Sequence, residues 1–294
     1  MKFQNRKPYI YLMLSLIFLP ACSFFKSNIK EIASLTQVSD VLDKANENTL
    51  VVFDMDDTLI APADNMFHLT WREANDFDAA DVKFVKQLRK DFEKIAFSKN
   101  DPDYLNKFRA AVFAKTQFNS AEPGTVSIVK NLQSHGVKVI ALTSSNTGRF
   151  VVIESMQKWR QSNLNQVGLN FSTSFELQEA SFYKLEKMFG FYPVFYKGIL
   201  CAAGNPKGKA LAAFIEKVGW TPSNVIFFDD GYHHCKSVAS EMKKLGIPVK
   251  CFWYKAACQT KIKLNHEVVR YQFNHWVERE EFLTDEKALI FLHH

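Results

Sequence analysis

The chain has 294 residues, of which 47% are hydrophobic and 23% are charged, and its formal net charge is +6. Residues 1–21 hold three basic residues and no acidic ones, so removing them would lower the net charge to +3. This near-neutral balance, with no basic stripe interleaved with aromatic residues, excludes the usual signature of nucleic-acid binding. We find no internal repeat and no low-complexity segment.

The N-terminus has the pattern of a bacterial export signal. Basic residues within 1–7 precede an apolar stretch from about residue 8 to 21, which is too short to span a bilayer comfortably. The sequence Leu19-Pro20-Ala21-Cys22 then resembles a lipobox, where cleavage before the cysteine leaves it to carry lipid. We expect a signal peptide over 1–21, a bilayer anchor on Cys22, and a place in the bacterial envelope on the periplasm-facing outer membrane. An ordinary secretory signal or an uncleaved anchor are the alternatives.

Four further cysteines remain: Cys201, Cys235, Cys251 and Cys258. An even number in an exported protein permits disulfides, but none forms a CxxC or another zinc-type spacing. Cys201 and Cys251 lie in apolar runs that are typical of buried thiols. The sequence leaves pairing and burial open.

The first part of the chain predicts a tether, a helix, a strand and a helical region, in that order. Residues 22–48 are expected to form the tether and a helix at about 36–46, where apolar residues have helical spacing. A strand follows at about 49–54. From about 62 to 124 the pattern is polar and helical.

The second part alternates helices and strands. The predicted elements are a helix at 125–134, a strand at 137–142, a helix from about 150, a strand at about 168–171, a hairpin within 191–203 centred on Lys197-Gly198, a helix at 207–218, strands at 224–228 and 249–254, and two C-terminal helices, the second begun by Thr284. This alternation predicts an α/β fold with a parallel sheet covered on both faces. One domain over residues 49–294, with an insertion, fits the length.

An acidic cluster follows the first strand of this domain. The apolar run Val51-Val52-Phe53 ends in Asp54-Met55-Asp56-Asp57-Thr58. Neighbouring carboxylates at a strand end are costly unless a cation or hydrogen-bond donors compensate them. Ligands in α/β proteins bind beyond the carboxyl ends of the strands. The cluster therefore indicates a metal and phosphate site rather than a solvated acidic turn.

Three other segments carry matching chemistry. Thr143 and Ser144 follow the strand at 137–142, Lys207 opens a helix, and Asp229-Asp230 ends the strand at 224–228. All these strand ends meet at one edge of a parallel sheet. Carboxylates, hydroxyls and a lysine are thus expected to converge.

With these motifs in this order, the chain after residue 48 resembles the haloacid dehalogenase superfamily of phosphotransferases. The resemblance implies a Rossmann-like doubly wound parallel sheet with a helical cap inserted at about 62–124. It implies that Asp54 attacks phosphorus and forms an aspartyl-phosphate, while Asp56 protonates the leaving oxygen and then activates water. It also implies that Thr143, Ser144 and Lys207 bind the phosphoryl group.

The resemblance further implies Mg²⁺ held by Asp54, the backbone carbonyl of Asp56, Asp229 and Asp230, with Asp230 the expected direct ligand. The residue types agree with elementary chemistry. Mg²⁺ prefers oxygen ligands and screens an anionic nucleophile from an anionic phosphate ester. A covalent carboxylate intermediate splits one slow step into two, and a neighbouring acid serves both. Aspartate at 56 argues against dehalogenase chemistry.

The fourth motif reads Asp229-Asp230-Gly231-Tyr232-His233-His234-Cys235, which is similar to the paired-aspartate variant of the superfamily. Together with the leader and the segment Asn205-Pro206-Lys207-Gly208, it resembles a bacterial branch whose members include exported proteins. This resemblance implies no particular substrate.

Other polar residues have weaker predicted roles. We expect Asp57 to be a solvated or capping carboxylate and Lys209 to be a lesser rival of Lys207. His68, Trp71 and Arg72 in the insertion, and Arg149 after the second motif, are candidate substrate contacts, although packing is the stronger reading of the first three. His233 and His234 are expected near the site but not on the metal, since Mg²⁺ prefers oxygen. The aromatic stretch 191–196 is expected to be core or lid.

The sequence thus predicts a Mg²⁺-dependent phosphate monoester hydrolase acting on a small phosphorylated substrate. A non-catalytic envelope lipoprotein that uses this fold for binding, and a phosphotransferase with an alcohol acceptor, are the alternatives.

Overall fold

The structure, a computed structural model, describes residues 29–188, 190–256 and 261–293. The predicted signal peptide and the predicted lipidation site Cys22 lie outside the described residues, as does Cys258.

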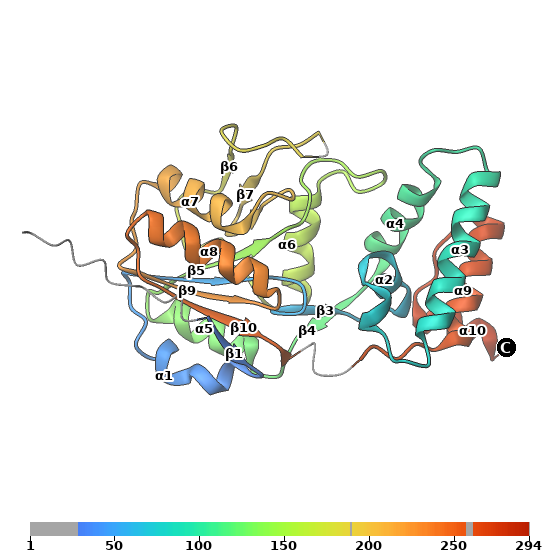
Figure 1. Ribbon diagram of the computed structural model, residues 1–294, viewed down its shortest axis with the longest axis horizontal. Coiled ribbons are helices and arrows are strands. Elements are labelled where there is room, and N and C mark those ends of the chain that lie inside the picture. Colours follow the sequence, from blue (N-terminus) through green and yellow to red (C-terminus); the bar gives the residue numbers. More distant parts are fainter. Residues whose placement is uncertain (1–28, 189, 257–260, 294) are drawn as a thin grey trace, which may run out of the picture.

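An eight-stranded sheet in the order β1-β10-β9-β2-β5-β8-β7-β6 forms the centre of the molecule (Figure 1). Neighbours are parallel from β1 to β8, and β8, β7 and β6 are antiparallel. The strands are β1 (Ile29–Ile32), β2 (Thr49–Phe53), β5 (Lys138–Thr143), β6 (Glu179–Ser181), β7 (Val194–Tyr196), β8 (Ile199–Cys201), β9 (Asn224–Asp229) and β10 (Val249–Tyr254). The predicted α/β fold with a mostly parallel sheet is confirmed.

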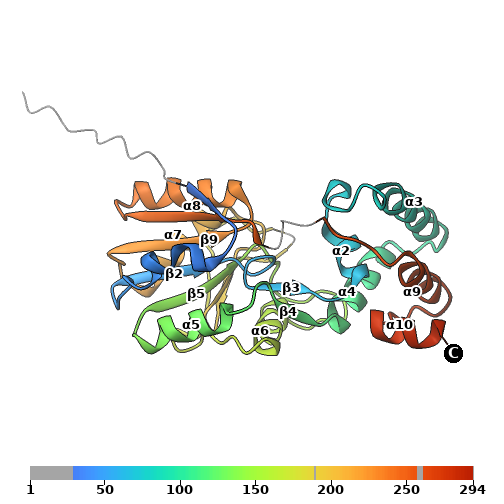
Figure 2. The same cartoon turned by 90° about the horizontal axis from the view of Figure 1, so that it is seen from below.

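Helices lie on both sides of this sheet (Figure 2). On one side are α7 (Lys207–Val218) and α8 (Tyr232–Lys244); on the other are α5 (Thr125–Ser134), α6 (Met156–Gln166), the short α1 (Ser39–Leu42) and a 3-10 turn at Leu35–Val38. Alternate residues of β2 serve the two cores, with Val51 and Phe53 in one and Leu50 and Val52 in the other. Burial on both faces explains the continuous apolar run before Asp54.

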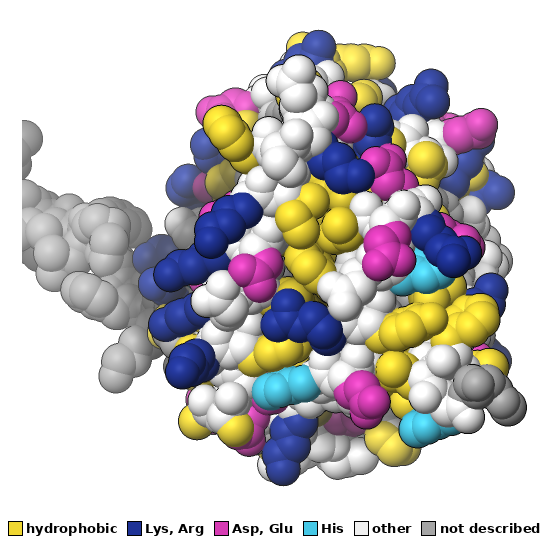
Figure 3. Space-filling view, turned by 90° about the vertical axis from the view of Figure 1, so that its right-hand side faces the viewer, with side chains coloured by type: hydrophobic (Ala, Val, Ile, Leu, Met, Phe, Trp, Pro, Cys, Tyr) yellow, Lys and Arg dark blue, Asp and Glu magenta, His cyan; other side chains and the backbone are white. Residues whose placement is uncertain are grey.

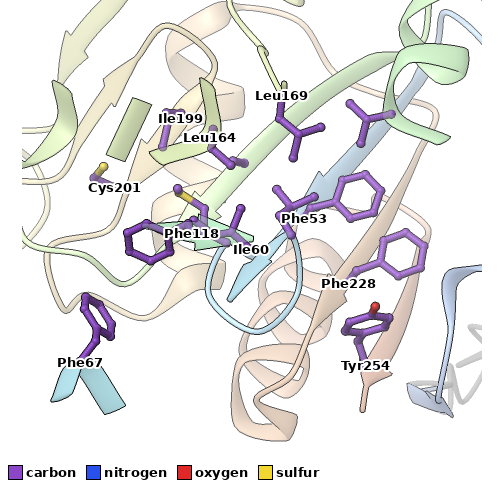
Figure 4. Close-up of a cluster of buried hydrophobic side chains, with 14 of the residues drawn as sticks. Phe53, Ile60, Phe67, Phe118, Leu164, Leu169, Ile199, Cys201, Phe228 and Tyr254 are labelled. Carbon is purple, nitrogen blue, oxygen red and sulfur yellow. The ribbon is translucent and has the colours of Figure 1, made fainter. Parts of the chain in front are cut away.

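Aromatic rings brace the strands that carry the acidic residues. The ring of Phe53 at the end of β2 stacks on Phe228 of β9, with ring centroids 4.8 Å apart. Phe228 stacks in turn on Phe252 of β10 at 5.0 Å. Figure 4 shows Phe53 and Phe228 side by side within the buried cluster. This packing fixes the ends of β2 and β9 relative to each other.

A second group of helices, the helical module, stands beyond the carboxyl ends of the parallel strands (Figure 1). It contains α2 (Asn65–Trp71), α3 (Val82–Ser98), α4 (Tyr104–Lys115), α9 (His266–Arg279) and α10 (Asp285–Leu292), with a 3-10 turn at Ala74–Asp76. A two-stranded antiparallel ribbon of β3 (Ile60–Pro62) and β4 (Phe118–Ser120) links it to the sheet. The insertion and the C-terminal helices therefore form one unit.

The helical module has an aromatic core of its own. The ring centroid of Phe92 on α3 lies 4.4 Å from Phe108 on α4 and 5.5 Å from Phe273 on α9. Phe108 also packs on Trp276 at 5.3 Å. On the outer face, basic and acidic side chains are interspersed with apolar ones (Figure 3), and Phe97, Ile290 and Phe291 are exposed.

The first turns of α2 and α10 cap each other. The backbone N–H of Asn65 donates to Asp285 Oδ2 at 3.0 Å, and the backbone N–H of Asp285 donates to Asp64 Oδ1 at 2.8 Å. Thr284 precedes α10 as predicted but makes no capping bond with its side chain. The cap comes instead from 220 residues or more away in the sequence.

Two predictions near the N-terminus were wrong. Residues 29–32 form the edge strand β1 rather than a tether, because Ile29-Lys30-Glu31-Ile32 pairs with β10. The helix predicted at 36–46 is a 3-10 turn at Leu35–Val38 followed by α1, which ends at Leu42. Pairing with a distant strand is not visible in so short a segment.

Two further predictions differ from the structure after β5. The helix expected from about 150 begins at Met156, where Ser155 accepts a capping hydrogen bond from the N–H of Lys158. Residues 168–171 form no strand although Leu169 and Phe171 are buried, because both edges of β5 are already paired, with β2 and with β8. Apolar burial alone does not distinguish a strand from a packed loop.

The predicted hairpin centred on Lys197-Gly198 is confirmed as β7 and β8. Gly198 has φ +84°, and a Cβ there would lie 2.3 Å from the carbonyl oxygen of Phe171. Gly219 has φ +64° with no atom within 4 Å of such a Cβ.

Gly198→Ala is expected to lower the free energy of unfolding by about 2–5 kcal/mol, because a left-handed backbone cost of about 1–2 kcal/mol adds to a backbone clash of about 1–3 kcal/mol. Gly219→Ala, the matched control, is expected to cost only about 1–2 kcal/mol. Urea unfolding of both variants measures the difference, and equal losses would contradict the clash.

Candidate active site

The predicted strand-end carboxylates meet at the centre of the sheet. Asp54 directly follows β2 and Asp229 is the last residue of β9, and Phe53 and Phe228 are register partners. The N–H of Asp54 donates to the carbonyl of Phe228 at 2.8 Å, which continues the ladder to the acidic residue. The neighbours of β2 on its two sides are β5 and β9, so the acids lie where the strand order reverses.

Lys207 lies between these two acids. Its Nζ donates to Asp54 Oδ1 and, at 2.7 Å, to Asp229 Oδ2. Lys207 is 1% exposed, Asp54 5% and Asp229 0%, so the three groups form a buried ionic cluster. Lys209, the weaker sequence candidate, is exposed.

The pKa shifts of these residues reflect the free-energy cost of burying their charges. Burial raises the pKa of Asp54 well above its ordinary value, against the lowering effect of Lys207, and Asp229 and Asp230 raise it further. Burial also raises the pKa of Asp229, again opposed by Lys207. Burial alone would lower the pKa of Lys207, but the two carboxylates outweigh it and raise that pKa. One cation does not offset this group of acids.

Asp230 completes a set of three carboxylates. One oxygen from each of Asp54, Asp229 and Asp230 lies within 4.8 Å of the others. Burial, followed by repulsion from Asp229, raises the pKa of Asp230 to about 6. The donors are all oxygens, and three carboxylates outnumber the single positive charge of Lys207. Such a set of ligands suits a hard divalent cation such as Mg²⁺.

Local bonds fix the direction of the paired aspartates. Asp229 Oδ1 accepts from the N–H of Gly231 at 2.8 Å, and the carbonyl of Asp230 accepts from Trp253 Nε1 at 2.8 Å. A Cβ on Gly231 would lie 2.8 Å from His234 Cδ2 and 3.1 Å from Asp229 Oδ1. A larger residue at position 231 would therefore require the side chain of His234 to shift.

Thr143 is the last residue of β5, the other neighbour of β2, and Ser144 follows it. Thr143 is buried and its Oγ1 accepts from the N–H of Ser145 at 3.1 Å. Ser144 Oγ lies 3.5 Å from His234 Nε2. Burial lowers the pKa of His234 to about 3, so its imidazole is neutral at physiological pH. His233 is exposed.

Arg160 on α6 is a site residue that sequence reasoning missed. Its Nη2 donates to Asp56 Oδ1 at 2.7 Å and its Nη1 to Asn163 Oδ1 at 3.2 Å. Its guanidinium lies over the ring of Trp159, 5.1 Å from the centroid, and the side chain is 2% exposed. The signal was present: Arg160 occupies an inward position of α6 together with Met156 and Leu164.

Asp57 corrects another prediction. It is not solvated but 2% exposed, and it forms an ion pair with Arg72 at the end of α2. Arg72 therefore reaches the acidic turn, as its candidacy as a substrate contact required, but its charge is paired with a protein carboxylate. Thr58, next in the turn, is fully buried.

The remaining candidates lie elsewhere. His68 is half-buried on α2, and the side chain of Trp71 lies outside the described part of the structure. Arg149 is exposed and donates to the carbonyl of Val151 at 3.1 Å. Phe195, in the aromatic stretch, is fully buried in the core. Cys201, Cys235 and Cys251 are buried free thiols.

Two pockets lie away from the carboxylates. One of about 550 Å³ is at the opposite edge of the sheet and is lined by Ile29, Ile226 and Val249 among others. Another of about 310 Å³ lies in the helical module, where Arg72 forms part of its wall. Within the described ranges, no helix combines the length and the apolar character needed to cross a membrane.

His68 should make stability depend on pH. Burial, and then the charge of Arg72, lower its pKa from 6.5 to about 4. The unfolded chain therefore binds a proton at higher pH than the folded chain, and stability is lost as pH falls from about 6.5 towards about 4. His68→Gln is expected to remove about 2 kcal/mol of this loss between pH 7 and pH 4.5, measured by urea unfolding at the two pH values. Parallel pH profiles of parent and variant would show that His68 does not contribute.

A family model described as a protein of unknown function, DUF2608, matches residues 31–289. An uncharacterised protein of Rickettsia prowazekii is 21% identical over 210 residues, covering 71% of this chain and 70% of that protein. An uncharacterised protein of Rickettsia bellii is 24% identical over 243 residues, covering 80% and 78%. One from Rickettsia felis is 27% identical over 118 residues, or 40% of each chain. The family match includes every residue of the acidic site.

Proposed function

Within the DUF2608 family, to which the chain belongs, we propose that this protein is a Mg²⁺-dependent phosphate monoester hydrolase of the haloacid dehalogenase type. The observation that carries the proposal is the buried contact of Lys207 with both Asp54 and Asp229, beside Asp230. A cluster of acids with a single shared lysine is costly for stability and suits an anionic substrate together with a cation.

Asp54 is the proposed nucleophile. Its carboxylate oxygen attacks phosphorus, the bond from phosphorus to the leaving oxygen breaks, and an aspartyl-phosphate forms; water then attacks phosphorus and releases phosphate. Lys207 holds the carboxylate of Asp54 in place and lies where it can neutralise the transferring phosphoryl group. Bound Mg²⁺ would supply the charge screening that lets an anionic carboxylate approach an anionic ester.

Asp54, Asp230 and the backbone carbonyl of Asp56 are the proposed direct ligands of Mg²⁺. Both oxygens of Asp229 already accept hydrogen bonds, one from Lys207 and one from Gly231. Asp229 therefore serves mainly to orient Lys207 and to add negative charge near the metal.

Asp56 is the proposed general acid and base. It donates a proton to the leaving oxygen in the first half of the reaction and accepts one from water in the second. Arg160 holds Asp56 Oδ1, which directs the other carboxylate oxygen to proton transfer. Asp56 is 26% exposed, which gives it access to solvent water.

Thr143 and Ser144 are proposed to bind the phosphoryl oxygens. Because Thr143 Oγ1 already accepts from Ser145, its own hydroxyl hydrogen can donate to the phosphoryl group. The insertion is proposed to act as a cap, since the helical module stands beyond the strand ends that carry the acids (Figure 1). Export and a lipid anchor on Cys22, facing the periplasm, are proposed from the leader sequence alone.

Asp54→Asn is expected to abolish hydrolysis of an aryl phosphate by residues 23–294 in the presence of Mg²⁺, because an amide oxygen is too weak a nucleophile. The parent chain should turn over with Mg²⁺ and not with EDTA. Beryllium fluoride with Mg²⁺ should raise the melting temperature of the parent and not of the variant. If the parent neither turns over nor responds to beryllium fluoride, the binding-protein alternative is favoured.

Arg160→Gln is expected to lower kcat about 10- to 100-fold, because Asp56 loses the partner that orients it. KM should change by less than about threefold, since Arg160 is not among the residues proposed to bind the phosphoryl group. Arg149→Gln is the control, because it removes an exposed arginine that donates to the carbonyl of Val151 in the loop before α6. Steady-state kinetics of both variants tests this role, and equal kcat values would contradict it.

A further inference from the structure

The turn after the proposed nucleophile contains a residue in the left-handed backbone conformation. Asp57 has φ +61°, a left-handed conformation that few residues other than glycine, asparagine and aspartate adopt readily. Its N–H donates to the carbonyl of Ile60 at 2.8 Å, and the N–H of Ile60 donates to the carbonyl of Met55 at 2.9 Å. This turn passes directly from Asp54 into β3 and so into the helical module.

Arg72 comes back to this turn from the helical module. Its side chain is 11% exposed and that of Asp57 is 2% exposed, so the ion pair between them is buried. The backbone of Arg72 is itself held, because Arg89 on α3 donates from Nη2 to the carbonyls of Leu69 and Arg72. The pair therefore joins α2 and α3 to the acidic turn by a contact that does not follow the β3–β4 ribbon.

The charges around the pair give it a second effect. Burial raises the pKa of Asp57 to about 7, and the neighbouring guanidinium of Arg72 opposes that rise. Without a cation here, a buried carboxylate would lie next to Asp56 and Asp230. Removing one member of a buried ion pair leaves an uncompensated charge, whereas removing both is much less costly.

We propose that Asp57 and Arg72 are positioning residues: their ion pair holds the helical module against the turn that carries Asp54 and Asp56. The inference rests on the proposed function for its kinetic consequence, but its structural consequence is independent of catalysis. In this proposal the pair acts through the turn rather than through a contact with the phosphoryl group or the metal.

The test is a double-mutant cycle of Arg72→Gln, Asp57→Asn and the two combined. Each single change should speed amide hydrogen exchange over residues 60–72 and 118–120 by at least about 10-fold, and should lower kcat/KM for an aryl phosphate by a similar factor. The double variant should show no faster exchange and no lower kcat/KM than the worse single variant, because each single change already breaks the pair. Arg72→Lys keeps the charge and should fall between parent and Arg72→Gln; it carries the comparison if Arg72→Gln does not fold.

Arg270→Gln is the control, because it removes an arginine from an ion pair with Asp91 that lies wholly within the helical module. The inference would be overturned if Arg72→Gln and Asp57→Asn gave the same exchange over residues 60–72 as this control. It would also be overturned if the two single losses in kcat/KM multiplied in the double variant. Coupled exchange without any hydrolysis by the parent would refute only the proposed function. Hydrolysis without coupling would refute only the positioning role.

Discussion

The contact between Lys207 and the carboxylates of Asp54 and Asp229 is the constraint around which the candidate active site is organised. The three charges come from a strand end, a helix start and a second strand end, and each is nearly or fully buried. Their mutual attraction offsets the cost of desolvation only if the lysine lies within hydrogen-bond distance of both carboxylates. That distance depends on the strand register and on where α7 begins. The β2–β9 ladder sets that register, and the stacked rings of Phe53 and Phe228, the residues directly before the acids, support it. Packing and chemistry are therefore coupled at the centre of the sheet.

The same logic extends outward to the other two acids of the turn. Asp56 is paired with Arg160 from the sheet side, and Asp57 with Arg72 from the helical module. Adjacent carboxylates in one turn are thus directed to opposite sides by two arginines from different parts of the chain. Each arginine is fixed by further contacts: Arg160 by Asn163 and Trp159, and the backbone of Arg72 by Arg89. The turn is held from both directions, which a solvated acidic loop would not be.

The sequence predicted the sheet and the members of the site because both depend on local patterns. The run Val51–Phe53 before Asp54, and the helix opening at Lys207, are readable from neighbouring residues alone. Arg160 and the burial of Asp57 were missed because their partners lie far along the chain; Arg160 and Asp56 are 104 residues apart. The strand β1 was missed for the same reason, since only β10 makes it a strand. Features that depend on pairing between distant segments cannot be predicted from the local periodicity of the sequence.

The reciprocal caps between α2 and α10 have a consequence for the order of folding. Asn65 and Asp285 are 220 residues apart, and Asp91 and Arg270 are 179 apart. Synthesis from the N-terminus completes α2, α3 and α4 long before α9 and α10. Until then the aromatic residues of the insertion lack their partners on α9. Bringing segments so far apart in the sequence together has an entropic cost that slows folding. The helical module, which is the proposed cap, should therefore be the last part of the structure to become native, because α9 and α10 must first be synthesised.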